Sequence, residues 1–227
     1  MKTSWEYLSY SLNESMSGYG NGDRIQISRI RNQAEGHSSN NTAISLPSHF
    51  GTHIDYPLHF DLNGKSGNDY EADFFIFDHP KVIELEPISS DNHLLISPDY
   101  LGNFDYSDLT DILIIKTGYC YKRSDNEYWQ NNPGFAPETA AFLKEKLPNL
   151  RAIGFDSISL SSYQHREIGR IAHREFLSVN DILIIEDMDL TFIDSNTIFK
   201  QIIVSPFRFD LADGAPVTVL ANILHEV

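Results

Sequence analysis

Cysteine is almost absent from this chain: Cys120 is the only one among 227 residues. A disulfide within the chain is therefore excluded, and the sequence is compatible with a reducing compartment. A lone cysteine can be a catalytic nucleophile, but Cys120 follows an apolar run, where a small buried thiol is the more common role. We therefore expect Cys120 to be buried and unreactive.

Positive charge and long apolar runs are scarce as well. The chain has 17 lysines and arginines but 32 aspartates and glutamates, so its formal net charge is −15. This excess would repel nucleic acid and anionic membranes, and neither is expected as a partner. No run approaches the ~20 apolar residues of a membrane-spanning helix, and Met1–Glu6 lacks the apolar segment of a signal peptide. We expect a cytoplasmic protein.

The residues that are present fit one globular domain. Apolar residues make up 41% of the chain and charged residues 22%, the balance of a protein with a sizeable core. At this length we expect a single domain over residues 1–227.

Apolar patterning predicts an α/β fold. Asp111–Ile115 and Arg151–Asp156 have the apolar content of buried strands, and Glu138–Leu147 between them has its apolar residues at helical spacing. This strand–helix–strand order favours parallel pairing. A short helix is expected to start near His165, with a turn at Asn180. The other expected strands are Trp5–Leu12, Arg24–Ile30, Thr42–Pro47, Gly51–Tyr56, Lys81–Leu85, Asp181–Glu186, Lys200–Pro206 and Ala215–Leu224.

Two segments in the middle of the chain have less regular patterns. Asp61–Asp73 has no hydrophobic period, so we expect a flexible loop beside a functional site, and such loops often cover pockets. Phe74–Phe77 is an apolar cluster. Packing in the core or against a second subunit is favoured for it over a substrate-facing wall.

The residues that could carry chemistry are concentrated in one short stretch. Three histidines and one carboxylate fall within eleven residues: His49, His53, Asp55 and His59. Imidazole nitrogens and carboxylate oxygens are the ligands that suit Zn²⁺, Mn²⁺ or Fe²⁺. A single histidine is usually a packing or surface residue, whereas four potential ligands in this order point to a metal site.

The backbone of this stretch is predicted to be extended. Gly51 and Pro57 both disfavour a helix interior. In a strand, His53 and Asp55 point to the same side because they are two residues apart. His49 can join them across the turn that Gly51 permits. Three ligands then converge, which is the arrangement of a catalytic metal that keeps an open position for water.

The pattern His49-x-Gly51-Thr52-His53-x-Asp55-x-Pro57-x-His59-Phe60 resembles the signature of the metal-dependent cyclase/hydrolase family. That family includes bacterial kynurenine formamidase and isatin hydrolase. The resemblance implies a swivelling β/β/α fold, with a central mixed sheet or flattened barrel flanked by helices. It also implies a homodimer or homotetramer with sites near the subunit contacts.

Further matches extend the resemblance over most of the chain. The family completes its metal site with a histidine on a helix and a glutamate after the next strand, and His173 and Glu186 fill these positions. The spacing leaves Asp187 as an alternative to Glu186. The segment around Asp213-Gly214 and Pro216-Val217 is similar to the family's final hairpin, which we expect to be structural and without chemistry.

One loop departs from the family's pattern. It commonly contains an aromatic residue followed by Pro-Gly-Asp, and the aromatic residue forms a wall of the substrate pocket. Here Gly22 and Asp23 match, but Gly20 stands at the aromatic position and Tyr19 lies one residue earlier. Tyr19 is therefore a candidate substrate-binding residue, with a surface-packed aromatic as the alternative. The departure affects the choice of substrate and not the metal.

Together these residues predict a metal-dependent hydrolase of a small amide. One or two divalent ions, zinc or manganese, would be held by His49, His53 and Asp55, and by the implied ligands His173 and Glu186. The metal would supply hydroxide to attack the carbonyl. His59 would be the general acid and base, because histidine titrates near neutral pH.

The resemblance implies an aryl formamide such as N-formylkynurenine, an intermediate of tryptophan catabolism, or a cyclic amide as the substrate. Two alternatives stay open. One is a cyclase or dehydratase of a biosynthetic pathway, and the other is a non-catalytic binding module with a structural metal. The presence of His59 weighs against the second, since a structural site needs no proton carrier.

Overall fold

The computed structural model describes residues 2–86 and 95–225, and a nine-stranded mixed sheet forms its centre. The strand order is β5-β12-β13-β4-β11-β10-β8-β6, and β1 pairs with β13. The strands of this sheet are β1 (Lys2–Tyr7), β4 (His53–Asp55), β5 (Ile76–Phe77), β6 (Pro80–Glu84), β8 (Ile112–Lys116), β10 (Ala152–Phe155), β11 (Leu183–Glu186), β12 (Ile198–Pro206) and β13 (Gly214–His225).

The parallel half of the sheet contains the buried strands that the sequence predicts. The strands β8 and β11 flank β10, both parallel to it, and every residue of the three is buried. Strands covered on both faces need continuous apolar runs, which is why these segments lack the alternation of a half-exposed strand. The repeated Asp-Ile-Leu-Ile-Ile sequences at 111 and 181 thus lie on either side of β10.

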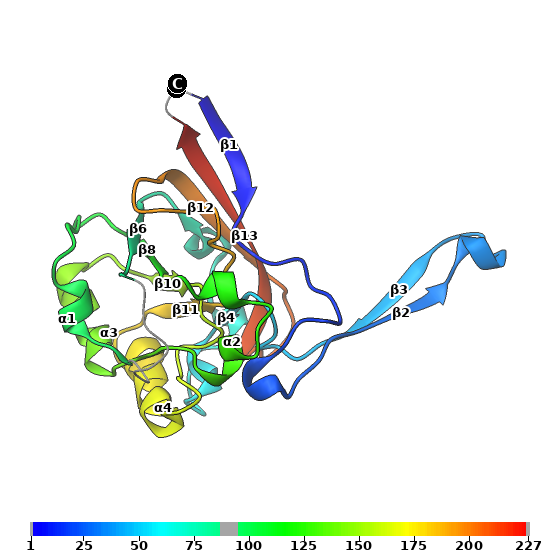
Figure 1. Ribbon diagram of the computed structural model, residues 1–227, viewed down its shortest axis with the longest axis horizontal. Helices are drawn as coiled ribbons and strands as arrows, with labels where there is room; N and C mark the ends of the chain where they lie inside the picture. The colour runs from blue at the N-terminus through cyan, green and yellow to red at the C-terminus, as the bar shows by residue number, and fades with distance from the viewer. Residues whose placement is uncertain (1, 87–94, 226–227) are drawn as a thin grey trace.

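The other half of the sheet is antiparallel and meets the parallel half at β4. This short strand pairs antiparallel with β11 on one side and with β13 on the other. The far strand β12 comes close to β6 at the opposite edge, so the sheet is nearly closed. Helices flank it, as Figure 1 shows. This is the mixed sheet or flattened barrel with flanking helices that the resemblance implies.

The helices are short. They are α1 (Pro98–Leu101), α2 (Glu127–Gln130), α3 (Glu138–Lys146) and α4 (Arg166–Arg174), with a π-helical turn at Glu175–Val179. Of these, α1, α3 and α4 lie together beside the parallel strands (Figure 1). A small second sheet pairs β7 (Leu95–Ile96) with β9 (Gly134–Phe135) in parallel. Among the described residues, no helix has the length and apolar character needed to cross a bilayer.

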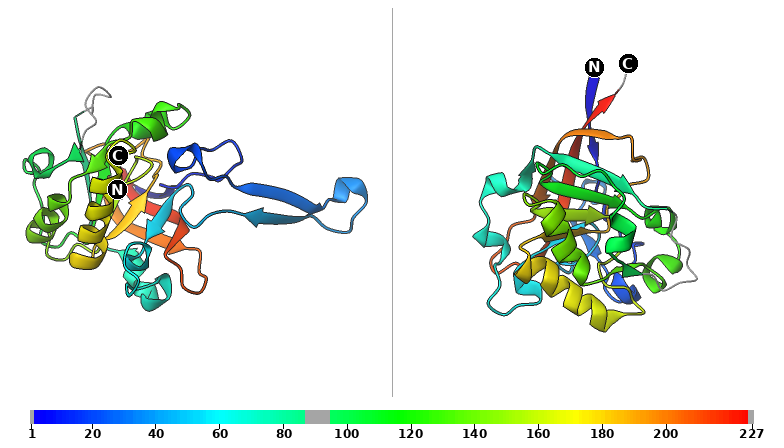
Figure 2. Two further views of the ribbon diagram at one scale, coloured as in Figure 1. Left: turned by 90° about the horizontal axis from the view of Figure 1, so that it is seen from below. Right: turned by 90° about the vertical axis from the view of Figure 1, so that its left-hand side faces the viewer.

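A hairpin arm projects from this body. It consists of β2 (Gln26–Arg31) and β3 (Asn41–Ser45), which pair with each other. Every residue of both strands is exposed, and Figures 1 and 2 show the arm extending well beyond the sheet. The sequence predicts both strands, but their position outside the body is not encoded in a local pattern.

Several local expectations need correction or refinement. The first strand ends at Tyr7, before the predicted end at Leu12. Phe77 is fully buried, and the neighbouring phenylalanines pack against the main core, in agreement with the core-packing interpretation. Cys120 is buried as expected, and burial raises the pKa of its thiol, which disfavours the reactive thiolate.

Candidate metal centre

The turn and strand around residue 51 bring the first histidines and the aspartate together. Gly51 has a φ of 66°, in the left-handed region that glycine adopts readily. After this turn, β4 places His53 and Asp55 on one side, with 3.4 Å between His53 Nε2 and Asp55 Oδ1. His49 Nδ1 lies 2.8 Å from the same Asp55 oxygen. The side chains of His49, His53 and Asp55 therefore converge, as the spacing in the sequence predicts.

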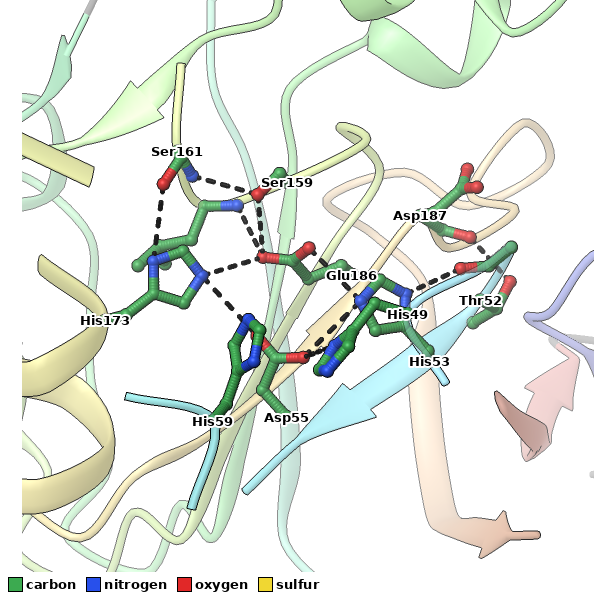
Figure 3. A network of polar contacts seen from close by, with 12 residues as sticks. His49, Thr52, His53, Asp55, His59, Ser159, Ser161, His173, Glu186 and Asp187 are labelled. Atoms are coloured by element: carbon green, nitrogen blue, oxygen red, sulfur yellow. Dashed lines mark hydrogen bonds and ion pairs between the residues drawn. The ribbon is translucent and has the colours of Figure 1, made fainter. Parts of the chain in front are cut away.

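Two further side chains reach the same point from distant parts of the chain. The antiparallel register of β4 and β11 sets Glu186 directly opposite His53. His173 enters from α4, which runs alongside (Figure 3). Each of the two buried carboxylates, Asp55 and Glu186, turns one oxygen toward His53 and the other toward His173. The four Nε2–oxygen distances are 3.4, 3.4, 3.5 and 3.4 Å.

These separations have the size of a metal coordination sphere. Four ligand atoms arranged tetrahedrally at bonds of about 2.1 Å from one ion lie about 3.4 Å from one another. The distances are longer than those of good hydrogen bonds. Among the described residues, the donor atoms of three groups lie within 4.8 Å of one another inside each group: His49, His53 and Asp55; Asp55, His173 and Glu186; and His49, His59 and Asp213. The first two groups share Asp55.

Backbone contacts fix how two of the histidines face this centre. His53 Nδ1 is 2.8 Å from the carbonyl oxygen of Gly51, and His173 Nδ1 is 2.8 Å from that of Gly169. When Nδ1 donates its proton to a carbonyl, Nε2 is left as the lone-pair nitrogen that a metal requires. Both Nε2 atoms point to the carboxylates.

The side chain of Glu186 faces the cluster and that of Asp187 does not. Leu160 N donates to Glu186 Oε1 at 2.6 Å, which anchors the carboxylate. Asp187 has a φ of 55°, so the chain turns at this residue and the Asp187 carboxylate points away from the cluster. Arg123 Nη2 donates to Asp187 Oδ2 at 2.8 Å, and Tyr128 donates to the other oxygen. Figure 3 shows the Glu186 carboxylate facing the histidines and the Asp187 carboxylate pointing away from them.

Asp213 is a member of the site that the sequence did not reveal. It belongs to the segment that was expected to be structural only. Its Oδ2 lies 3.0 Å from His49 Nε2 and 3.5 Å from His59 Nδ1. Gly214 opposite Asp55 in the β4–β13 register delivers it there. No sequence spacing signals this contact, because more than 150 residues separate Asp213 from both histidines.

The charges in this cluster depend on each other. Burial lowers the pKa of His49, but the carboxylates of Asp55 and Asp213 outweigh it and raise that pKa to about 10. Burial likewise opposes the protonation of His173, whose pKa nonetheless rises to about 9 beside Asp55 and Glu186. The histidines in turn hold the pKa of Asp55 well below its usual range, against the effect of burial. Buried carboxylates here need cationic partners, and a divalent ion would be one.

His59 is placed to act beside this centre. It ends the turn of 3₁₀-helix Pro57–His59, and its ring stacks on that of His49 with 3.9 Å between centroids. Its side chain is 28% exposed, whereas those of His53 and His173 are 5% and 4% exposed. His59 therefore borders the solvent side of the cluster, where a substrate can reach it.

A cavity of about 360 Å³ opens onto the cluster. Its lining includes Tyr19 and also side chains of the cluster: His49, His53, His59, His173 and Glu186. The Tyr19 candidate is thus in the position of a pocket wall. None of residues 61–77 lines this cavity, so the expected covering role of Asp61–Asp73 is not seen.

Comparison with known proteins shows which family this chain resembles. Residues 7–162 match the model of the Cyclase family, described as "Putative cyclase". The kynurenine formamidase of Geobacillus thermodenitrificans is 31% identical over 218 residues, which are 96% of each chain. That of Bacillus cereus is 27% identical over 218 residues, 96% of this chain and 97% of the relative.

Solved structures share the fold at lower identity. Isatin hydrolase A from Labrenzia aggregata superimposes with a TM-score of 0.80 at 18% identity, covering 98% of this chain and 94% of its own. A structure described as a potential metal-dependent hydrolase with cyclase activity gives a TM-score of 0.75 at 19% identity, covering 99% and 100%. The family model that matches residues 7–162 and the relatives that align over nearly the whole chain show that this chain belongs to the Cyclase family.

Proposed function

We propose that this protein is a metal-dependent hydrolase of a small amide, an aryl formamide such as N-formylkynurenine or a cyclic amide. The observation that carries the proposal is the closed set of nitrogen–oxygen distances of 3.4–3.5 Å among His53, Asp55, His173 and Glu186. The names of the full-length relatives support the aryl formamide.

The residues present fit a divalent ion. Three imidazoles and two carboxylates form a donor set that suits zinc or manganese. His49, His53 and Asp55 would hold one ion, and Asp55 would share a second with His173 and Glu186. Such an ion lowers the pKa of water and polarises a carbonyl oxygen.

The protein's own residues would manage the protons. In hydrolysis, a water oxygen bonds to the amide carbon, the carbon–nitrogen bond breaks, and one proton from water passes to the departing nitrogen. We assign that transfer to His59, which borders the cavity. The Asp213 carboxylate faces His59 Nδ1 and would keep the ring in one orientation. A binding module without catalysis would have no use for this pair.

A metal-supplemented activity panel tests the proposal. The purified protein is treated with a chelator and then given Zn²⁺ or Mn²⁺, and hydrolysis of N-formylkynurenine, isatin and simple lactams is measured. We expect activity on at least one amide that the chelator abolishes and the metal restores. Activity that survives complete metal removal, or a metal-loaded protein that hydrolyses none of these amides, contradicts it.

A glycine beside His49 offers a separate test of the site. A Cβ atom on Gly214 would lie 2.2 Å from His49 Cε1, which no real contact allows. Gly214→Ala should therefore displace the ring and weaken metal binding by about 10–100-fold, the range found when the support of a ligand is lost. Metal titration measures this. Gly102→Ala is the matched control, since its Cβ would meet its nearest atom at 3.4 Å.

We also propose a homodimer in which the hairpin arm packs on a second copy. Three isoleucines of the arm are exposed to 37%, 58% and 59%: Ile27, Ile30 and Ile44. An isolated two-stranded hairpin is marginally stable in water, so the arm needs a partner. A groove between the arm and β13, lined by apolar residues such as Ile25, Leu46 and Val217, could receive the arm of the second copy.

Charged substitutions on the arm test the dimer. Ile30→Asp combined with Ile44→Asp should convert a dimer to a monomer, because each buried aspartate would lose its hydration in the interface. Light scattering after size exclusion measures the mass. Ser28→Asp adds charge to the same exposed strand and serves as the control. A monomeric wild-type protein would rule out the arm as an interface.

A further inference from the structure

Two arginines line the cavity that opens onto the cluster. Among the residues that the structure describes, Arg166 and Arg170 are the only lysines or arginines that line it, and its acidic lining residues include Asp23 and Glu186. Arg170 is already engaged, since its Nη1 lies 2.6 Å from Glu167 Oε1. Within residues 2–86 and 95–225, no carboxylate lies within ion-pair distance of Arg166.

Aromatic rings hold the Arg166 guanidinium in place. Its Cζ lies 4.1 Å from the centroid of the Tyr163 ring and 5.8 Å from that of Tyr19. The ring centroids of the two tyrosines are 5.8 Å apart in an edge-to-face contact, and Trp129 makes an edge-to-face contact with Tyr163 at 5.7 Å. Stacking on a ring restrains a guanidinium while its N–H edge stays available for a planar anion.

The helix α4 carries both Arg166 and the cluster residue His173. Arg166 opens α4, and His173 follows seven residues later, so the two side chains share one face of the helix. Seven residues of α-helix rise about 10 Å. This rise separates their backbone positions, so a ligand that reaches both residues would carry its anionic group several bonds from the carbonyl at the metal cluster.

We propose that Arg166 binds a carboxylate of the substrate and thereby selects amides that carry a carboxylate several bonds from the scissile amide. A guanidinium pairs with a carboxylate through two parallel hydrogen bonds, and both groups are charged, which strengthens them. Tyr19 then serves as part of the platform for Arg166. This inference rests on the proposed hydrolase function and adds to it the class of substrate.

Two pairs of compounds test the inference on the metal-loaded protein. N-formylkynurenine and N-formylkynuramine differ by the carboxylate and serve for kinetics. Kynurenine and kynuramine differ in the same way and serve for binding by calorimetry, which needs no turnover. Each is measured with the wild type, Arg166→Gln, Arg166→Lys and Arg208→Gln. Arg208 is exposed and outside the cavity lining, so its variant controls for the loss of one positive charge.

We expect Arg166→Gln to raise KM for N-formylkynurenine and Kd for kynurenine by about 10–100-fold, the range for a lost charge-assisted hydrogen bond. The kcat of Arg166→Gln, its KM for N-formylkynuramine and its Kd for kynuramine should stay within about twofold of the wild type. Arg166→Lys should recover part of the lost affinity for the carboxylate compounds.

Equal wild-type affinity for kynurenine and kynuramine would overturn the inference. So would unchanged kynurenine binding in Arg166→Gln, since the carboxylate would then bind elsewhere. Failure to hydrolyse either formamide would instead count against the proposed function, while the binding measurement would still decide the role of Arg166.

Discussion

Replacing His59 by alanine is expected to lower kcat by about 10²–10⁴-fold, the usual contribution of a positioned acid and base. The metal content should stay that of the wild type, because neither of the two groups that contain Asp55 includes His59. The leaving nitrogen would then depart without a proton donor. Turnover of the amide substrate and metal analysis by mass spectrometry measure the two quantities on the same sample.

The control for this variant is the same substitution at a surface histidine. His79→Ala removes an exposed imidazole that does not line the cavity, and it should leave kcat unchanged. Loss of metal from His59→Ala would show that His59 is a ligand and not a proton carrier. Full activity would remove it from the mechanism altogether.

Replacing Asp55 by asparagine is expected to empty the site and abolish activity. Asp55 is 1% exposed and faces His49, His53 and His173 at once, so each of the two possible ion positions depends on its carboxylate. An amide of the same shape has less charge to offer a divalent ion. We expect the fall in metal affinity to exceed the ~100-fold that the loss of an outer hydrogen bond can cost.

Dialysis followed by elemental analysis gives the metal content, and circular dichroism checks that the variant is folded. Asp73→Asn changes an exposed aspartate and should retain metal. If Asp55→Asn keeps half of the wild-type metal, two independent ions are present and Asp55 does not connect them. If it keeps all of the metal, Asp55 is not a ligand.

The structure around Gly20 gives a reason for the departure from the family's loop pattern, in which an aromatic residue stands at this position. The loop at Gly20 has a φ of 63°, and a Cβ there would come within 3.2 Å of the Tyr163 ring. A larger residue at this position would therefore displace Tyr163 or Arg166. Tyr19 and Arg166 of α4 both line the cavity here, and the Arg166 guanidinium lies over the Tyr19 ring. The sequence gives no sign that these two distant residues are in contact.

The sequence alone was sufficient for the parts of this protein that depend on local spacing. The alternation of His53 and Asp55 places them on one side of β4 by the geometry of a strand, and Gly51 permits the turn that returns His49. Continuous apolar runs identified β8, β10 and β11, because a strand buried on both faces is built mainly of apolar residues, and here Lys116 and Glu186 stand only at strand ends. The family resemblance then supplied His173 and Glu186.

Only the tertiary structure decided which distant residues join them. The register of β4 against β11 selects Glu186 over Asp187, and the register against β13 brings Asp213 to His49 and His59. The projection of the β2–β3 arm and the stacking of Arg166 on Tyr163 are likewise invisible in the chain. A repeating pattern reports the faces of one element, whereas these contacts depend on how separate elements pair across the closed sheet, which no local spacing records.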